Sequence, residues 1–240
     1  MKPILVIEQE YSLRGLGLLG ERLEDSGLPY RSLRAWEDSM DALDPLDFAA
    51  IIPLGGTGHA WEADRVPVLR TERQLLRSAV EAGVPVFGIC LGGQLLASAV
   101  GGEVRRAGEP EIGWLEIRPT GGAREDPIFR LLDEGVGVYQ WHNDVFEAPA
   151  GASILAFSEA APNQAFRVDG TDAWGIQFHP EVTPELWELW ISRHPVEVRE
   201  AGVDVDALRA AVYDGARRSL PFCSALFDAF IERVRSRSGP

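Results

Sequence analysis

A cysteine flanked by glycines is the first feature of this sequence that could do chemistry. The segment reads Phe87-Gly88-Ile89-Cys90-Leu91-Gly92-Gly93-Gln94. An apolar run precedes Cys90 and a helical pattern follows it, which is typical of a nucleophile elbow, where glycines relieve the contacts of a strained turn. The start of a helix also favours thiolate over thiol. On this segment alone, a buried structural cysteine in a glycine-rich turn stays open as the alternative.

A histidine and a glutamate two residues apart are the second candidate pair. They end the segment Trp174-Gly175-Ile176-Gln177-Phe178-His179-Pro180-Glu181. In extended backbone, residues i and i+2 project to the same side, so Glu181 can orient one nitrogen of His179 while the other nitrogen faces a thiol. A nucleophile, a base and an orienting carboxylate in the order Cys90, His179, Glu181 predict covalent catalysis through sulfur.

The elements that must position these residues can be predicted from apolar periodicity. Strands are expected at 4–7, 48–54 and 85–89, with helices at 16–25, 67–82 and 91–100 between and after them. Shorter extended segments follow at 113–118, 136–139, 154–157, 165–168 and 173–178, and the tail at 203–237 is expected to form two helices. Strands that first alternate with helices and later follow one another predict an α/β fold with a mixed, largely parallel central sheet flanked by helices.

The composition excludes several classes of protein. Of the 240 residues, 45% are hydrophobic and 25% charged, as in ordinary soluble proteins. A net charge of −14 disfavours nucleic acid as a partner. There is no apolar run of the roughly 18 residues that span a membrane, and no signal peptide. Two cysteines, Cys90 and Cys223, point to a reducing compartment, so we expect a cytoplasmic protein. Neither metal-ligand spacing nor a nucleotide fingerprint is found, so no metal and no cofactor are expected.

The two motifs together resemble those of the class I, triad-type glutamine amidotransferase domain. Among its members, the glutaminase domains of GMP synthases and their free-standing relatives are the most similar. The resemblance covers about residues 2–191 and implies a flavodoxin-like amidotransferase fold. The remainder, 192–240, is expected to be a helical extension packed on the same domain.

The resemblance also implies roles for particular residues. Cys90 would attack the side-chain amide of glutamine, and His179 and Glu181 would complete the triad. The oxyanion would be held by the backbone N–H groups of Leu91 and of Gly56, in the turn that follows the 48–54 strand. The substrate would be bound by Gln94 and by the segment that contains Gln140, Trp141 and His142.

Two segments depart from the family pattern. Thr57-Gly58-His59 replaces a proline-containing turn, and Trp141-His142-Asn143-Asp144 replaces Ser-His-Gly-Asp. Both are expected at the mouth of the site, so they leave the substrate and the ammonia acceptor open. A contact of His59 with substrate and a solvated loop position are both compatible with the sequence. His194 is expected only as a cation at a helix end, and the arginines at 233, 235 and 237 as a solvated cationic cap.

The activity implied by the resemblance is hydrolysis of the γ-amide of glutamine through a cysteinyl thioester. Because no nucleotide loop is present, ammonia would pass to an acceptor on a separate chain, such as a synthase subunit. One alternative is a free-standing γ-glutamyl peptidase with the same triad. Others are a peptidase or stress protein whose thiol is poised by Glu8, and a binding module with a vestigial site.

Overall fold

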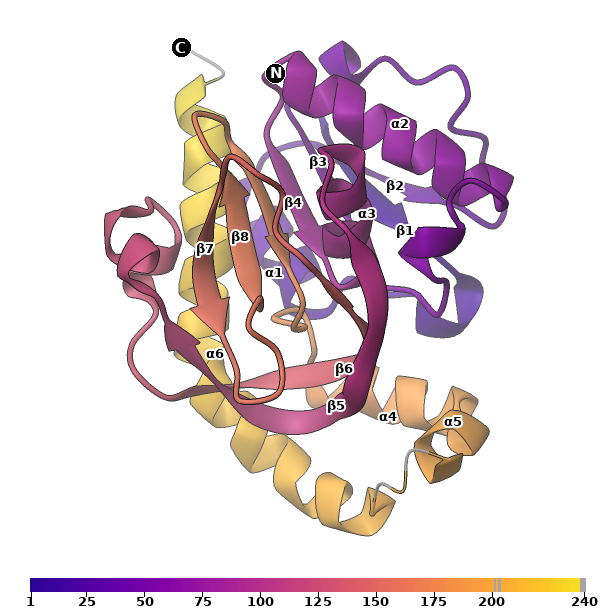
Figure 1. Cartoon of the computed structure of the whole chain (residues 1–240), viewed down its shortest axis with the longest axis vertical. Coiled ribbons are helices and arrows are strands. Elements are labelled where there is room, and N and C mark those ends of the chain that lie inside the picture. Colours follow the sequence, from indigo (N-terminus) through magenta and orange to yellow (C-terminus); the bar gives the residue numbers. More distant parts are fainter. Residues whose placement is uncertain (201, 203, 238–240) are drawn as a thin grey trace.

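The computed structural model describes residues 1–200, 202 and 204–237, so the remaining positions of the predicted extension lie outside the described residues. Within this part of the chain, nine strands form one sheet, flanked by helices on both faces (Figure 1). The strands are β1 (Ile4–Glu8), β2 (Tyr30–Arg34), β3 (Ala50–Pro53), β4 (Val86–Ile89), β5 (Val104–Pro119), β6 (Val136–Phe146), β7 (Ala152–Phe157), β8 (Ala165–Val168) and β9 (Ala173–Ile176). The α-helices are α1 (Gly17–Ser26), α2 (Pro67–Glu81), α3 (Leu91–Ala99), α4 (Pro184–Arg193), α5 (Pro195–Glu200) and α6 (Val205–Arg237).

The sheet is half parallel and half antiparallel, in the order β2-β1-β3-β4-β9-β8-β7-β5-β6. The pairs from β2 through β1, β3 and β4 to β9 are parallel, and those from β9 through β8, β7 and β5 to β6 are antiparallel. The predicted α/β fold with a mixed sheet is therefore confirmed, whereas "largely parallel" describes only the first half. The short links from β7 to β8 and from β8 to β9 permit antiparallel pairing alone, since a parallel pair needs a long crossover.

Two apolar layers lie on opposite faces of the sheet. Along β1 the side chains of Ile4 and Val6 join a core with α1 and α6, whereas Leu5 and Ile7 join one with α2 and α3. This division follows from the alternation of side chains along a strand. Because both faces are covered, β1 is a continuous apolar run, as the sequence predicted.

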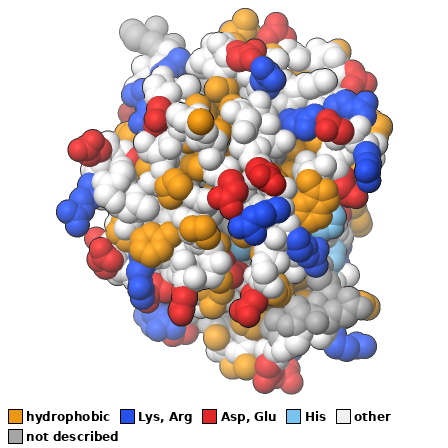
Figure 2. Space-filling model, viewed as in Figure 1, with side chains coloured by type: hydrophobic (Ala, Val, Ile, Leu, Met, Phe, Trp, Pro, Cys, Tyr) orange, Lys and Arg blue, Asp and Glu red, His pale blue; other side chains and the backbone are white. Residues whose placement is uncertain are grey.

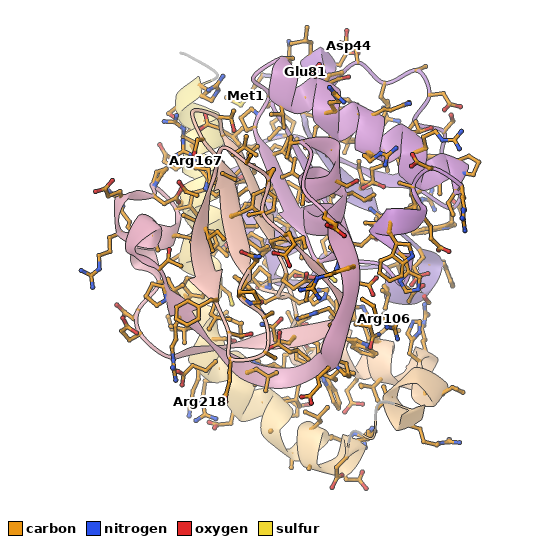
Figure 3. All side chains as sticks on the ribbon, viewed as in Figure 1. Met1, Asp44, Glu81, Arg106, Arg167 and Arg218 are labelled. Atoms are coloured by element: carbon orange, nitrogen blue, oxygen red, sulfur yellow. The ribbon has the colours of Figure 1, made fainter. Side chains whose placement is uncertain are left out.

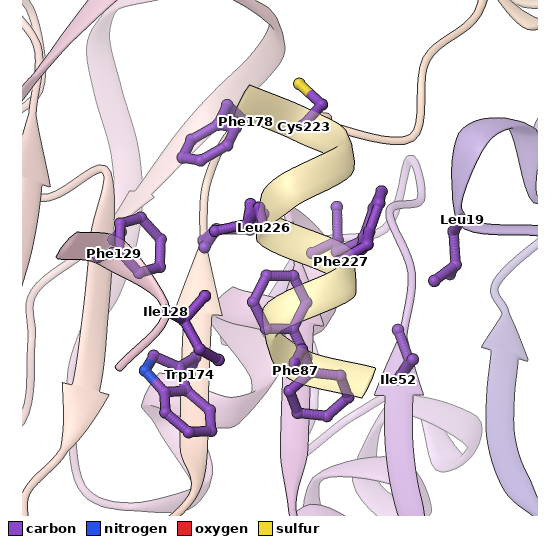
Figure 4. Close-up of a cluster of buried hydrophobic side chains, with 14 of the residues drawn as sticks. Leu19, Ile52, Phe87, Ile128, Phe129, Trp174, Phe178, Cys223, Leu226 and Phe227 are labelled. Carbon is purple, nitrogen blue, oxygen red and sulfur yellow. The ribbon is translucent and has the colours of Figure 1, made fainter. Parts of the chain in front are cut away.

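The tail is dominated by one helix of 33 residues, α6, so the prediction of two helices over 203–237 is wrong. Pro221 lies inside α6, where it removes one backbone donor. Apolar residues that follow it pack against the sheet: the ring of Phe227 lies 6.1 Å from that of Phe87 (Figure 4). The ring of Phe230 lies 5.2 Å from that of Phe87 and 6.1 Å from that of Trp174. This packing keeps the helix continuous through the proline, because tertiary burial contributes more to helix stability than propensity does.

The end of α6 is tied to the sheet by ion pairs, rather than forming only the solvated cap that the sequence predicted. Arg233 Nε lies 2.9 Å and Arg237 Nη1 2.7 Å from the carboxylate of Asp172, just before β9. The side chain of Asp172 is 2% exposed. Two arginines of the tail therefore neutralise a buried charge beside the central strands.

The surface is mixed in charge. Acidic and basic side chains are interspersed over the face drawn in Figure 2. Among the helices of the described ranges, none combines the length and the hydropathy that a membrane span requires.

Candidate active site

A strained turn presents Cys90 between β4 and α3. The residue has φ 50° and ψ −109°, and it is the only residue besides glycine with positive φ in the described ranges. Such a conformation costs on the order of 1–3 kcal/mol and persists where the surroundings enforce it. The backbone N–H of Cys90 donates to the carbonyl of Ile176, at 2.9 Å, which fixes the turn to the end of β9.

The glycines around Cys90 are required by close backbone approaches. A Cβ at Gly88 would lie 2.6 Å from the carbonyl oxygen of Gly92, and one at Gly93 would lie 2.5 Å from that of Ile176. A Cβ at Gly92 would overlap the carbonyl oxygen of Pro53 at the end of β3. The elbow therefore needs glycine at the positions where the sequence has it.

His179 lies three residues beyond the end of β9, the strand beside the elbow. The ends of β4 and β9 lie side by side because the two strands are parallel and in register, with Ile89 opposite Ile176. His179 Nδ1 lies 2.7 Å from Glu181 Oε1. Gly55 separates His179 from Cys90: a Cβ there would meet His179 Cε1 at 2.7 Å and Cys90 Cβ at 3.4 Å. The absence of a side chain at Gly55 thus lets the imidazole approach the cysteine.

The electrostatics favour a proton on His179. Burial alone would lower its pKa, but the negative charges of Glu181 and of the Cys90 sulfur, and hydrogen bonds to both, raise the pKa to about 10. A second group reaches the sulfur as well, since Gln177 Nε2 lies 3.7 Å from Cys90 Sγ. At neutral pH this arrangement favours the protonated, imidazolium form of His179.

The predicted oxyanion residues lie next to each other beside the elbow. Leu91 is the first residue of α3, so its N–H has no carbonyl one turn earlier in the helix to bond. Gly56 lies in the loop after β3, where an added Cβ would be 3.0 Å from Leu91 Cδ2. The neighbouring N–H of Gly92 donates to the carbonyl of Leu54 at 3.1 Å, which holds that loop against the elbow.

A buried carboxyl group supports the loop that carries Gly56. Glu72 of α2 is fully buried and accepts a hydrogen bond of 2.6 Å from Gln9 Nε2. Gln9 in turn packs on Gly56, where an added Cβ would lie 2.7 Å from Gln9 Cβ. Burial raises the pKa of Glu72 to about 8, although the hydrogen bond from Gln9 opposes the rise.

Cys90 and His179 open into one cavity, which encloses about 550 Å³ of empty space when its open mouth is counted. All four histidines of the sequence line it. Its lining comprises Leu13, Gly56, Thr57, Gly58, His59, Cys90, Gln94, Trp141, His142, Asn143, Asp144, His179, Trp190 and His194. The site therefore combines titratable groups with a tryptophan-rich wall.

Three of the four predicted substrate residues line the cavity. Gln94, Trp141 and His142 do so, and Gln94 Nε2 donates to the carbonyl of Asp144 at 3.2 Å. The side chain of Gln140 is fully buried and donates to Gln164 Oε1 at 2.9 Å. Gln140 therefore lies behind the cavity wall and is not among the described residues that line the cavity.

Carboxylates pair with two further histidines of the cavity. His59 Nδ1 lies 2.6 Å from Asp144 Oδ2, and His142 Nε2 lies 3.1 Å from Glu111 Oε2. Burial raises the pKa of Asp144, and the bond from His59 offsets part of the rise. Burial would likewise raise the pKa of Glu111, but hydrogen bonds from His142, Ser158 and Gln164 outweigh burial and lower the pKa.

The sequence placed Asp144 at the mouth of the site but did not predict its pairing with His59, and it predicted neither Glu111 nor the cavity position of His194. His194 ends α4 and its ring lies 6.1 Å from that of Trp141. Three consecutive polar residues, 142–144, inside a largely buried strand could have pointed to this role of Asp144, because buried polar side chains need a partner or a function. Glu111 and His194 have no comparable local signal.

Comparison with known proteins agrees with this architecture. The family described as glutamine amidotransferase class I matches residues 20–193. A GMP synthase (glutamine-hydrolysing) of Corynebacterium ammoniagenes is 33% identical over 182 residues, which are 75% of this chain and 32% of that protein. One subunit of a GMP synthase (glutamine-hydrolysing) from Sulfolobus acidocaldarius is 45% identical over 100 residues, which are 41% of this chain and 52% of that protein. The chain thus spans about a third of the full-length C. ammoniagenes synthase.

Solved structures cover almost the whole chain. A glutamine amidotransferase of Thermotoga maritima has a TM-score of 0.85 at 26% identity, covering 96% of this chain and 98% of its own. A glutamine amidotransferase of Methylobacillus flagellatus has a TM-score of 0.85 at 29% identity, covering 97% of this chain and 95% of its own. The family match over most of the chain confirms the resemblance seen in the two sequence motifs, and the chain belongs to the class I glutamine amidotransferases.

Proposed function

We propose that this protein hydrolyses the γ-amide of glutamine to glutamate and ammonia through a thioester on Cys90. One observation carries the proposal: the hydrogen-bonded pair of His179 and Glu181 shares a cavity with a cysteine held in a strained elbow. Nucleophile, base and orienting carboxylate are the parts that such covalent catalysis needs.

In the first half-reaction the Cys90 thiolate attacks the amide carbon and a carbon–sulfur bond forms. The oxygen that becomes negative accepts hydrogen bonds from the N–H groups of Gly56 and Leu91. His179 donates its proton to the nitrogen, the carbon–nitrogen bond breaks, and ammonia leaves. Glu181 stabilises the imidazolium before this transfer and keeps the ring oriented.

In the second half-reaction water attacks the thioester. His179, now neutral, takes a proton from the water, and the carbon–sulfur bond breaks to give glutamate. The step regenerates the thiolate and the imidazolium. No other group has to supply electrons or protons.

Asp144 suits the amino-acid end of the substrate. Its Oδ2 bonds His59, whereas Oδ1 is buried and has no hydrogen bond among the described residues, with Arg106 Nη1 at 3.9 Å. Arg106 lies on β5 (Figure 3). An α-ammonium group on Oδ1 would satisfy this buried carboxylate oxygen. Gln94 and the backbone of 139–142 would bind the rest of the substrate.

The ammonia would pass to an acceptor on a separate chain. The S. acidocaldarius relative is named as one subunit of a synthase, which supports such a division of labour. A reducing, cytoplasmic setting suits the two cysteines, which are both buried and free. The segment 192–240 would belong to the same domain, because side chains of α6 complete the core on one face of the sheet.

A free-standing γ-glutamyl hydrolase is the second candidate. The two segments that depart from the family pattern, Thr57-Gly58-His59 and Trp141-His142-Asn143-Asp144, both line the cavity. A leaving group larger than ammonia would contact them, which favours this reading of the same triad.

Labelling of Cys90 tests the mechanism shared by both candidates. Intact-protein mass spectrometry after treatment with a glutamine-like chloroketone should detect one label on the wild type and none on Cys90→Ala. Cys223→Ala is the matched control and should be labelled like the wild type, since burial raises the pKa of the Cys223 thiol to about 12. An unlabelled wild type, or a label that persists in Cys90→Ala, contradicts the mechanism.

Product analysis separates the two candidates. The wild type is incubated with glutamine or with a γ-glutamyl dipeptide, and glutamate and ammonia are measured. Release of ammonia from glutamine supports the glutaminase. Cleavage of the dipeptide with glutamine inert supports the γ-glutamyl hydrolase.

A further inference from the structure

We propose that His59 is a positioning residue, which fixes the loop carrying Gly56 by binding Asp144 on the opposite wall of the cavity. The inference rests on the proposed function, because Gly56 matters only if an oxyanion forms beside it. His59 Nδ1 and Asp144 Oδ2 are 2.6 Å apart, although the two residues are 85 positions apart in the sequence. The pair therefore bridges the loop after β3 and the strand β6.

The loop needs such a tether because of its composition. Its first residue, Leu54, is held by backbone hydrogen bonds to Ile7 and Gly92. The next four residues, 55–58, include three glycines, which leave the backbone conformationally free. Thr57 donates to Glu10 at 2.8 Å, but this bond is exposed to solvent. Gln9 packs on one side of the loop and Ala60 is buried just after it, and His59 adds a side-chain bond from the far end of the loop to β6 across the cavity.

His59 and Asp144 are each held in place by further contacts. The ring of His59 stacks on Trp61, with centroids 4.4 Å apart and planes 6° from parallel. The carboxylate of Asp144 is buried, and its backbone carbonyl accepts hydrogen bonds from Gln94 Nε2 and His142 Nδ1. The charged or titratable groups that face Asp144 are His59, Arg106 and His142. Asp144 is therefore a rigid anchor, linked to the helix that follows Cys90.

This geometry predicts an effect on turnover more than on binding. A donor to the oxyanion acts only once negative charge develops, so its displacement lowers kcat and leaves KM nearly unchanged. A shift of about 1 Å in a catalytic group can cost on the order of 100-fold in rate. A direct contact between His59 and the substrate would instead raise KM.

The test compares two replacements of His59 in the full-length protein. His59→Phe keeps an aromatic ring on Trp61 but loses the donor, whereas His59→Asn keeps a nitrogen near the position of Nδ1. Glu62→Gln, beyond the cavity lining of the described residues, is the matched control. Hydrogen exchange of the amides at 55–58 and the steady-state kinetics with glutamine, or with the γ-glutamyl dipeptide if only that is cleaved, are measured for each.

We expect His59→Phe to accelerate exchange at 55–58 at least about tenfold, since a loop without its tether opens more often. We expect kcat to fall about 10- to 100-fold with KM within about threefold, and His59→Asn to restore most of both. Unchanged exchange overturns the proposal, as does a raised KM at unchanged kcat. If the wild type is neither labelled at Cys90 nor active, the proposed function fails. The exchange rates then decide alone whether His59 fixes the loop.

Discussion

The buried carboxyl group of Glu72 should make the stability of this protein fall as the pH rises through the neutral range. In the folded protein its pKa is raised from 4.5, the ordinary value of glutamate, to about 8. Between these two values the folded state keeps a proton that the unfolded state has already released. Unfolding therefore releases a proton in this window, and higher pH favours the unfolded state. The stabilisation is complete below about pH 4.5 and is lost by about pH 8.

The magnitude follows from the linkage relation. One proton corresponds to about 1.4 kcal/mol per pH unit, so between about pH 5 and pH 7.5 the wild type loses about 3 kcal/mol through this group. Glu72→Gln can still accept the hydrogen bond from Gln9 but does not titrate. The free energy of unfolding of Glu72→Gln minus that of the wild type should therefore increase by about 3 kcal/mol over this interval.

Urea unfolding followed by tryptophan fluorescence at both pH values measures this difference, and the seven tryptophans provide the signal. Glu81→Gln is the matched control, because Glu81 lies on the same helix with its side chain 65% exposed. It should change the pH dependence by less than about 0.5 kcal/mol. Any constant offset in Glu72→Gln reflects the new amide group and does not bear on the argument. A difference that stays the same at both pH values would refute the reasoning.

Three further outcomes can be measured directly. In urea denaturation, Gly92→Ala should lower the free energy of unfolding by more than about 3 kcal/mol, because the new methyl group overlaps the end of β3. In the control Gly137→Ala a Cβ meets nothing within 4 Å, so its free energy of unfolding should stay within about 0.5 kcal/mol of the wild type. Glu181→Gln should lower the pKa of His179 from about 10, as seen in an NMR titration, and should reduce kcat on the order of 100- to 10,000-fold; an unchanged titration would contradict the assigned cause of the raised pKa. Asp172→Asn should cost about 2 kcal/mol in thermal unfolding, since the arginines of α6 lose a buried partner, and a loss below about 0.5 kcal/mol would show that the ion pairs contribute little.

The fold was predictable where local patterns and burial agree. The strands beginning at Ile4 and Val86 and the helix beginning at Pro67 have continuous apolar runs or a clear helical stripe, and each lies at its predicted place. By contrast, β2 was not predicted: of Tyr30–Arg34 only Leu33 is buried, because β2 lies at the edge of the sheet. The continuity of α6 through Pro221 also depends on contacts with distant strands, which a local pattern does not contain.

The same distinction applies to the candidate site, where residues with a local signal were predictable and residues that depend on distant partners were not. Cys90 and His179 have recognisable surroundings, because the elbow and the end of β9 impose glycine and spacing requirements on neighbouring residues. Asp144 and Glu111 act through partners far away in the sequence, such as His59 and His142. Their pairings depend on how β6 lies against the loop after β3 and against β5, so a local pattern could at most mark Asp144 as unusual and could not name its partner.

The adjacency of β4 and β9 constrains how this chemistry could be controlled. Cys90 and His179 extend from neighbouring strands in the middle of the sheet, joined there by the hydrogen bond from the N–H of Cys90 to the carbonyl of Ile176. Separating the ends of β4 and β9 would require breaking the centre of the sheet, at a cost close to that of global unfolding. An effector or a docking protein that acts on the segments at the rim of the cavity, such as the loop at 55–58, can therefore change the site at a lower cost than one that moves the strands themselves.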